Sequence, residues 1–220
     1  MKRSKITILL AIVLGMTFHS CLDLEPQDQL GGKNMWTSVN DYKQFANTFY
    51  SWTRDFSSVV YDGTHSDKRS DLITYQSYNE FSRGINSIPS SDANYTDNYK
   101  HIRRTNLLLQ NAEAYAKPED IKQYIGEAYF FRAYSYFDLL QLYGDVIITK
   151  KPLDITDPEM KVKRNDRSEV VDLIIDDLNH AVENLPAFKE LTTEEEGRIS
   201  KEGAQAFLSS CLLYTSDAAD

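Results

Sequence analysis

Apolar residues recur every three or four positions along much of this chain, which is the period of an amphipathic helix. In residues 36–56, Ser38 and Asp41 provide the side chains of a capped helix start. The stripe that follows predicts a first helix, and it consists of Tyr42, Phe45, Ala46, Phe49, Thr53 and Phe56.

Two further helices are predicted beyond a long polar region. The first begins near Asn98, and its expected face is Ile102, Thr105, Leu109, Ala112 and Ala116. The second begins at Pro118, a residue favoured at the first helical position, and ends before Gly144, a typical helix stop. Its expected face is Ile125, Ala128, Arg132, Tyr136, Leu139 and Tyr143.

The remaining pattern predicts a second pair of helices. Residues 145–154 are expected to be extended, a helix should run from about Ser168 to Leu185, and another should start after Ser200. The stripe between them is Val171, Ile174, Leu178, Ala181 and Leu185. The order of helix pair, linker and helix pair predicts a mainly α fold, a tetratricopeptide-like scaffold of helical pairs with long irregular loops. Small residues such as Gly126 and Ala133 favour close packing of the paired helices.

The polar segment 57–97 carries scattered aromatic residues and has little helical or strand period. Segments of this length inside a compact domain are usually functional or disordered. Side chains that offer hydrogen bonds and ring faces make Asp67, Arg69, Tyr75 and Tyr78 the candidate ligand-binding residues. The alternative is that these loop tyrosines merely cover the scaffold.

The N-terminus has the pattern of a secretion signal, with basic residues before the apolar run Ile6–Phe18 and then Ser20 and Cys21. The acidic stretch after Cys21 shows no regular period, as a tether would. A cysteine in this position resembles a bacterial lipobox, so we expect a signal peptide in residues 1–20 and a lipidated tether in residues 21–35. The alternative is an ordinary cleaved signal beside an incidental cysteine.

The last residues, 211–220, read CLLYTSDAAD. Their back-translation resembles a transposon-end adapter used to prepare sequencing libraries, so we expect this tail to be artefactual and the authentic helix to break near Ser210. A genuine polar C-terminus is the alternative. With Cys21 lipidated and Cys211 in the tail, no cysteine remains for a disulfide or a zinc site.

Composition and motifs argue against several classes of function. The formal net charge is −9 and the basic residues are scattered, whereas phosphate binding needs clustered Lys and Arg, so we expect no nucleic-acid partner. The histidines lack metal-ligand spacing, and no nucleotide-binding glycine pattern or G-x-S-x-G appears, so we expect no metal, no cofactor and no enzyme activity. The four histidines are His19, His65, His101 and His180.

Two charged positions on predicted helices need separate interpretation. Asp176 and Asp177 are adjacent and point about 100° apart on a helix, so an acid/base pair is not expected and a solvated face is. Arg132 falls on the apolar stripe of its helix. We expect it to be a structural buried charge bonded to a carboxylate or to helix-end carbonyls, with a ligand contact as the alternative.

The chain contains, in this order, the stretches CLDLEPQDQL followed by Trp36, IRRTNLLLQNA, GEAYFFRAYSYFDLLQLYGD, RSEVVDLIIDDLNHAVENLP and GRISKEGAQAFL. Together and in this order, they resemble the SusD/RagB family of surface lipoproteins. The resemblance runs from Cys21 to about Ser210. Family members are typically more than twice as long, so it implies an incomplete N-terminal helical domain over residues 36–210.

The resemblance implies a function as well as a fold. We expect a non-catalytic lipoprotein, anchored in the outer membrane and exposed at the cell surface, that binds an oligosaccharide or peptide and delivers it to a SusC-like TonB-dependent transporter. Two alternatives stay open: a structural adaptor that holds a partner protein with its helical repeats, and a surface glycan hydrolase.

Overall fold

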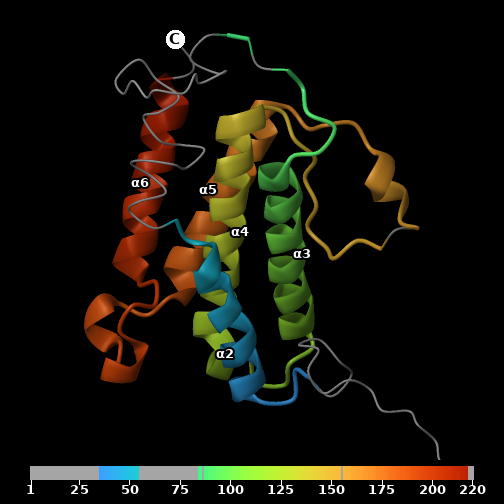
Figure 1. Cartoon of the computed structure of the whole chain (residues 1–220). Helices are drawn as coiled ribbons and strands as arrows, with labels where there is room; N and C mark the ends of the chain where they lie inside the picture. Colours follow the sequence, from blue (N-terminus) through green and yellow to red (C-terminus); the bar gives the residue numbers. More distant parts are fainter. Residues whose placement is uncertain (1–34, 55–83, 86, 155, 218–220) are drawn as a thin grey trace, which may run out of the picture. The chain divides into compact units, whose positions relative to one another are not determined.

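The computed structural model describes residues 35–54, 84–85, 87–154 and 156–217 (Figure 1). The chain divides into two compact units, Met1–Met35 and Trp36–Asp220. Every helix considered below belongs to the second unit.

The second unit is built from helices, which confirms the predicted mainly α fold. Its helices are α2 (Val39–Asn47), α3 (Ala93–Glu113), α4 (Lys122–Tyr143), α5 (Arg167–Asn184) and α6 (Lys201–Asp217), with short 3-10 helices that include η1 (Thr48–Trp52) and η4 (Pro118–Ile121). Consecutive helices from α3 to α6 run in opposite directions (Figure 1). Helix α4 packs against both α3 and α5, and α5 packs against α6. The two predicted pairs therefore stack through α4 and α5.

The predicted helix starts are largely confirmed by their caps. At α2, the Ser38 side chain accepts from the Asp41 backbone while the Asp41 side chain accepts from the Ser38 backbone. The α-helix ends sooner than expected, because the chain tightens into η1 after Asn47. Helix α3 begins earlier than predicted, since Asp92 accepts a hydrogen bond from the Asn94 backbone and caps it there.

Helix α4 forms the centre of the core, and the single apolar face expected for it is wrong. Phe130, Phe131 and Leu140, which lie off the expected stripe, are buried together with members of that stripe. In contrast, the stripe residues Ile125 and Tyr143 are only half-buried. A helix covered by neighbours on several sides has little amphipathic period, so the pattern showed only part of its buried surface.

Glycines set two features of α4. Gly144 ends the helix with φ +69°, a backbone conformation that favours glycine, as the sequence predicts. Gly126 lies against the end of α5, where an added Cβ would come within 2.9 Å of Leu185 Cγ and 3.1 Å of Asn184 Cβ. The expected role of Gly126 in close helix packing is therefore confirmed.

The segments after α4 and at the end of α6 complete the fold. Among the residues described, the expected extended stretch forms only one isolated antiparallel bridge, Val146 with Asn165. Helix α6 continues without a break past Ser210, and Cys211 is buried. The interpretation of residues 211–220 as artefactual stays a prediction.

Candidate functional site

The sequence-predicted site residues fall into two groups. Cys21 and the loop candidates lie outside the described residues, and those candidates are Asp67, Arg69, Tyr75 and Tyr78. Arg132 lies within the described helices, and its surroundings distinguish a structural charge from a ligand contact.

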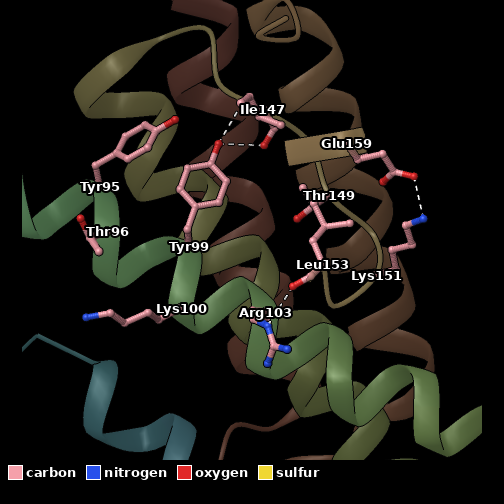
Figure 2. Close-up of a pocket in the computed structure, with 10 residues that line it drawn as sticks. All are labelled: Tyr95, Thr96, Tyr99, Lys100, Arg103, Ile147, Thr149, Lys151, Leu153 and Glu159. Atoms are coloured by element: carbon pink, nitrogen blue, oxygen red, sulfur yellow. Dashed lines mark hydrogen bonds and ion pairs between the residues drawn. The ribbon is translucent and has the colours of Figure 1, made fainter. Parts of the chain in front are cut away.

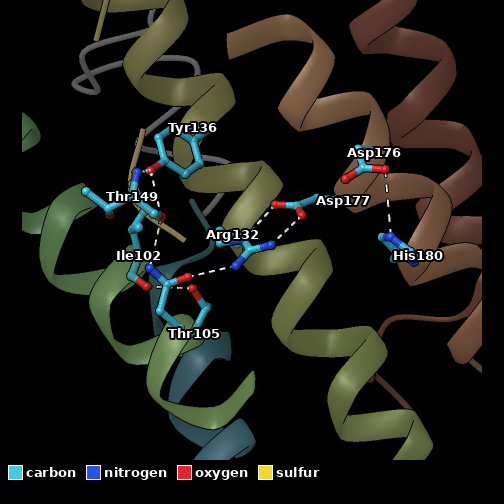
Figure 3. A network of polar contacts seen from close by, with 9 residues as sticks. Ile102, Thr105, Arg132, Tyr136, Thr149, Asp176, Asp177 and His180 are labelled. Atoms are coloured by element: carbon cyan, nitrogen blue, oxygen red, sulfur yellow. Dashed lines mark hydrogen bonds and ion pairs between the residues drawn. The ribbon is translucent and has the colours of Figure 1, made fainter. Parts of the chain in front are cut away.

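Arg132 lies inside the helical stack with 5% of its surface exposed (Figure 3). Its Nε and Nη2 atoms donate to the two carboxylate oxygens of Asp177 at 2.8 and 2.6 Å, and Nη1 donates to Asn106 Oδ1 at 2.8 Å. Asn106 in turn donates to the carbonyls of Thr149 and Lys151 at 3.0 and 3.2 Å. The guanidinium therefore joins α3, α4, α5 and the connection after α4, and a buried charge needs such pairing.

The expectation that Asp176 and Asp177 form a solvated face is wrong for Asp177. The Asp177 side chain is 0% exposed, whereas that of Asp176 is 58% exposed and lies 3.7 Å from His180 Nε2. Burial raises the pKa of Asp177, and the hydrogen bonds from Arg132 oppose that rise. Asp177 faces α4, where Arg132 supplies the counter-charge that a buried carboxylate needs.

Another buried ion pair joins α4 to the segment before α6. Arg198 Nε and Nη2 donate to the Glu127 carboxylate at 2.8 and 2.6 Å, and the Glu127 side chain is 0% exposed. The Arg198 guanidinium lies 5.3 Å from the Tyr50 ring centroid and 5.4 Å from that of Tyr124. The Tyr50 hydroxyl accepts from the Ile199 backbone at 3.0 Å. The Arg132 pair thus connects two helices, and the Arg198 pair connects α4 to the segment before α6. None of the four paired residues lines either of the two cavities described below.

A groove of about 550 Å³ lies between α3 and part of the connection after α4, which contributes Ile147, Thr149, Lys151, Leu153 and Glu159 (Figure 2). We call it the α3 groove. Tyr95 and Tyr99 line it from α3, and Ile147 and Leu153 line it from the opposite segment. Its volume is within the usual range for small-ligand sites, and its walls are largely apolar, as such sites are.

Contacts within the protein hold the tyrosine rings of the groove in place. The ring centroids of Tyr95 and Tyr99 are 4.8 Å apart, and Tyr95 meets Tyr143 edge-to-face at 5.2 Å. The Tyr99 hydroxyl donates to the Ile147 carbonyl and accepts from the Ile147 N–H, both at 2.9 Å. Burial raises the pKa of Tyr99, so its hydroxyl stays protonated at neutral pH. A wall fixed before the ligand arrives reduces the ordering cost of binding.

The rim of the α3 groove is polar and exposed. Lys151 Nζ lies 2.7 Å from Glu159 Oε1, and this hydrogen bond raises the pKa of Lys151. Arg103 Nε donates to the Leu153 carbonyl at 3.2 Å, and the Lys100 side chain is 67% exposed. Because these groups stay in water, a ligand can engage them without the cost of breaking a buried pair.

Sequence reasoning missed this groove for a local reason. Tyr95 was assigned to the irregular segment 57–97, because α3 was expected to begin only near Asn98. With the helix starting at Ala93, Tyr95 and Tyr99 stand four residues apart on one face, a spacing that brings side chains together. The capping aspartate Asp92 is the signal that could have placed both rings on the helix.

Metal sites and membrane-spanning helices are two further possibilities for the residues that the structure describes. No group of three or more His, Cys, Asp and Glu side chains there could hold a metal ion. None of the helices described combines the length and apolar character needed to cross a membrane.

Comparison with known proteins identifies the family. A family model described as SusD-like, "Starch-binding associating with outer membrane", matches residues 22–213. The chain therefore belongs to the SusD-like family, as its sequence blocks indicate.

Similar proteins of known structure or curated sequence agree with this assignment. A curated SusD-like protein of Formosa agariphila is 28% identical over 84% of this chain and 38% of its own length. A crystal structure of a SusD-like protein from Bacteroides fragilis is 27% identical with a TM-score of 0.70, covering 86% of this chain and 37% of that one. A laminarin-binding SusD-like protein is 30% identical with a TM-score of 0.56, covering 63% of this chain and 30% of that one. The chain thus spans less than half the length of these relatives.

Proposed function

We propose that this protein is a non-catalytic lipoprotein of the outer-membrane surface that binds a glycan and delivers it to a SusC-like TonB-dependent transporter. Membership of a family described as starch-binding and associated with the outer membrane supports this proposal. The single observation that carries it is the preformed α3 groove, which presents tyrosine rings beside an exposed polar rim.

A glycan suits the chemistry of this groove. A sugar ring has an apolar face of C–H groups, which stacks on an aromatic ring, and hydroxyls at its edge, which both donate and accept hydrogen bonds. Tyr95 and Tyr99 offer the ring surfaces, whereas Lys100 and Glu159 at the rim offer a donor and an acceptor. Starch and laminarin, the polysaccharides that describe the family and one relative, are both glucans. We therefore propose a glucan as the ligand, with a peptide as the alternative class.

Affinity electrophoresis in gels containing laminarin or starch tests this function. We expect the wild-type protein to be retarded by at least one of the two glucans. Tyr95→Ala should weaken binding about tenfold, equivalent to about 1.4 kcal/mol, because it removes a ring from the wall. Tyr95→Phe is the matched control, since it keeps the ring and should keep most of the affinity. Unretarded wild-type protein, or equal retardation of wild type and Tyr95→Ala, would contradict the glucan site.

The loop residues selected from the sequence remain proposed contacts in this function. Asp67, Arg69, Tyr75 and Tyr78 would add hydrogen bonds and ring faces to the ligand. Alanine substitution of each residue in turn, measured in the same gels, tests them separately from the α3 groove. A set of four variants that all bind like wild type would remove them from the site.

The proposed anchor is lipid on Cys21. We expect Cys21→Ala to stop incorporation of a labelled lipid precursor and to move the protein from the membrane fraction to the soluble fraction. Ala116→Leu, at an exposed position outside residues 1–35, is the control, and it should leave both measurements unchanged. Continued labelling of the Cys21→Ala protein would overturn the lipobox interpretation. Co-purification of a barrel transporter with the wild-type protein would test the proposed partner.

A further inference from the structure

A second hollow lies on the other flank of α3. It has a volume of about 200 Å³, and the residues that α3 contributes to it include Asn98 and His101. The α3 groove is lined instead by Tyr95, Tyr99 and Arg103. With 3.6 residues per turn, the mean directions of these two sets differ by about 130° around the helix, and the two cavities share no lining residue. The second hollow, which we call the Trp52 hollow, is therefore separate from the α3 groove.

One wall of the Trp52 hollow is flat and aromatic. The Trp52 and His101 rings are stacked, with centroids 4.1 Å apart and an interplanar angle of 14°. The Trp52 ring also contacts Phe49, whose ring centroid lies 4.7 Å away, and Phe131 at 5.9 Å. Burial lowers the pKa of His101 to about 4, so the imidazole is neutral at neutral pH. The wall is thus rigid and uncharged.

Other walls of the Trp52 hollow carry polar groups whose charges are balanced. Asn98, which is 7% exposed, donates its side-chain amide to Asp138 Oδ2 at 2.8 Å, and Arg54 forms an ion pair with the same carboxylate. Asp97, at the outer edge, lies 2.7 Å from Lys100 Nζ. The hollow therefore offers fixed donors and acceptors without an uncompensated charge, which favours a neutral ligand rich in hydroxyls over an ion.

The size of the Trp52 hollow limits what it can hold. Its volume of about 200 Å³ is well below that of the α3 groove, about 550 Å³. It is also below the usual range of about 300–1,000 Å³ for ligand sites, so it suits one ring and not a chain of several.

We propose that the Trp52 hollow is a second binding site, which takes a single neutral sugar unit such as the end of a glucan chain. This inference rests on the proposed function for the sugar class, but it concerns a different set of residues. A protein with two sugar sites on opposite flanks of one helix would bind a polysaccharide more tightly than a short fragment, because the second contact becomes intramolecular.

Titration with D-glucose tests the Trp52 hollow directly, because the signals of the tryptophan side chains can be compared. The chain has two tryptophans, and Trp36 packs instead against Tyr42 and Phe45 at ring-centroid distances of 5.0 and 4.7 Å. In a ¹H–¹⁵N spectrum of the protein, titration with glucose should shift the indole N–H signal of Trp52 and leave that of Trp36 in place. An unmoved Trp52 signal, or equal movement of both signals, would overturn the proposal.

A substitution that fills the Trp52 hollow provides the matching variant. Ala93, at the start of α3, is exposed and lines the Trp52 hollow, so Ala93→Leu adds volume there without removing a hydrogen-bonding side chain. We expect it to weaken the glucose response of Trp52 about tenfold or more, as blockage of a small site should. Ala116→Leu, at an exposed position after α3, should leave the response unchanged. If Ala93→Leu lowers the melting temperature, Tyr134→Phe serves instead. This variant removes only a hydroxyl from the lining, and it should likewise weaken the glucose response of Trp52.

The two proposals can fail separately. Retardation by laminarin or starch that is lost in Tyr95→Ala, together with no glucose shift at Trp52, would retain the α3 groove and reject the Trp52 hollow. A glucose shift at Trp52 that Ala93→Leu removes, without any retardation of the protein by either polysaccharide, would do the reverse. A shift that Tyr95→Ala removes and Ala93→Leu does not would also reject the Trp52 hollow, because it would trace the response to the groove.

Discussion

The interface between α4 and α5 and the outer flank of α3 both contain charged side chains, yet they use them differently. Between α4 and α5, Arg132 and Asp177 are 6% and 0% exposed in their side chains and are bound to each other. On the flank of α3, Lys151 and Glu159 form a pair with side chains that are 53% and 48% exposed. Inner charges are committed to holding helices together, whereas outer charges remain accessible to a ligand.

The difference explains why an arginine on an apolar stripe is a poor guide to a binding site. A charge that enters the core must find a partner there, because desolvation is costly. Each guanidinium nitrogen of Arg132 accordingly donates to a protein group. Exposed pairs contribute little to stability, so a ligand can rearrange them at small cost. Ligand contacts are therefore expected along the α3 groove and not at Arg132.

Arg132→Leu should cause the largest loss of stability among these variants. It leaves Asp177 buried without its counter-charge, and we expect the free energy of unfolding to fall by about 3–5 kcal/mol. Chemical denaturation measures the loss. The double variant Arg132→Leu/Asp177→Leu is the control, and it should recover much of the stability because no charge stays buried. A double variant as unstable as the single one would contradict the buried-pair interpretation.

Gly126→Ala tests the same interface without changing a charge. The new Cβ would lie 2.9 Å from Leu185 Cγ and 3.0 Å from Leu185 N, so the ends of α4 and α5 must separate. Overpacking costs about 1–3 kcal/mol, and the better helix propensity of alanine returns up to about 1 kcal/mol. We expect a lower melting temperature. Gly203→Ala is the control, since its Cβ would meet mainly the flexible end of Ile199, and an equal loss there would contradict the close-packing account.

His101, which lies on the other side of α3, should make a smaller, pH-dependent contribution to folding stability. Burial lowers its pKa from 6.5 to about 4, with Arg104 and Lys100 adding to the shift and Asp97 opposing it. Between these pH values the unfolded chain binds a proton that the folded chain does not, so stability falls as the pH drops from about 6.5 to about 4. Partial exposure of the ring limits the loss to about 1 kcal/mol. Thermal melts across this range should show a shallower decline for His101→Gln, and identical pH profiles would contradict the assignment.

The sequence predicted the helices well where caps and period agree. Ser38 with Asp41, Pro118 and Gly144 marked boundaries that depend on local chemistry, and local chemistry is visible in a sequence. The prediction of a single apolar face failed for α4, because a helix buried on several sides by distant segments has no single apolar stripe. The buried position of Asp177 was missed for a related reason, since its partner lies on another helix.

The candidate site was less predictable than the fold. The sequence pointed to Asp67, Arg69, Tyr75 and Tyr78, which lie outside the described residues. The α3 groove depends on how Ile147, Leu153 and Glu159 come to lie beside the helix, and no spacing rule reports such long-range proximity. Only the four-residue interval from Tyr95 to Tyr99 was open to sequence reasoning, once the helix start was placed correctly.

The most direct test measures glucan affinity and unfolding free energy in the same two variants, Tyr95→Ala and Asp177→Asn. We predict that Tyr95→Ala lowers affinity for the retained glucan about tenfold and costs less stability than Asp177→Asn. Asp177→Asn should lower the free energy of unfolding by about 3 kcal/mol, because it strands the Arg132 charge, with affinity changed less than in Tyr95→Ala. Loss of affinity in Asp177→Asn at unchanged stability, with unaltered binding by Tyr95→Ala, would contradict the separation of inner structural charges from an outer binding groove.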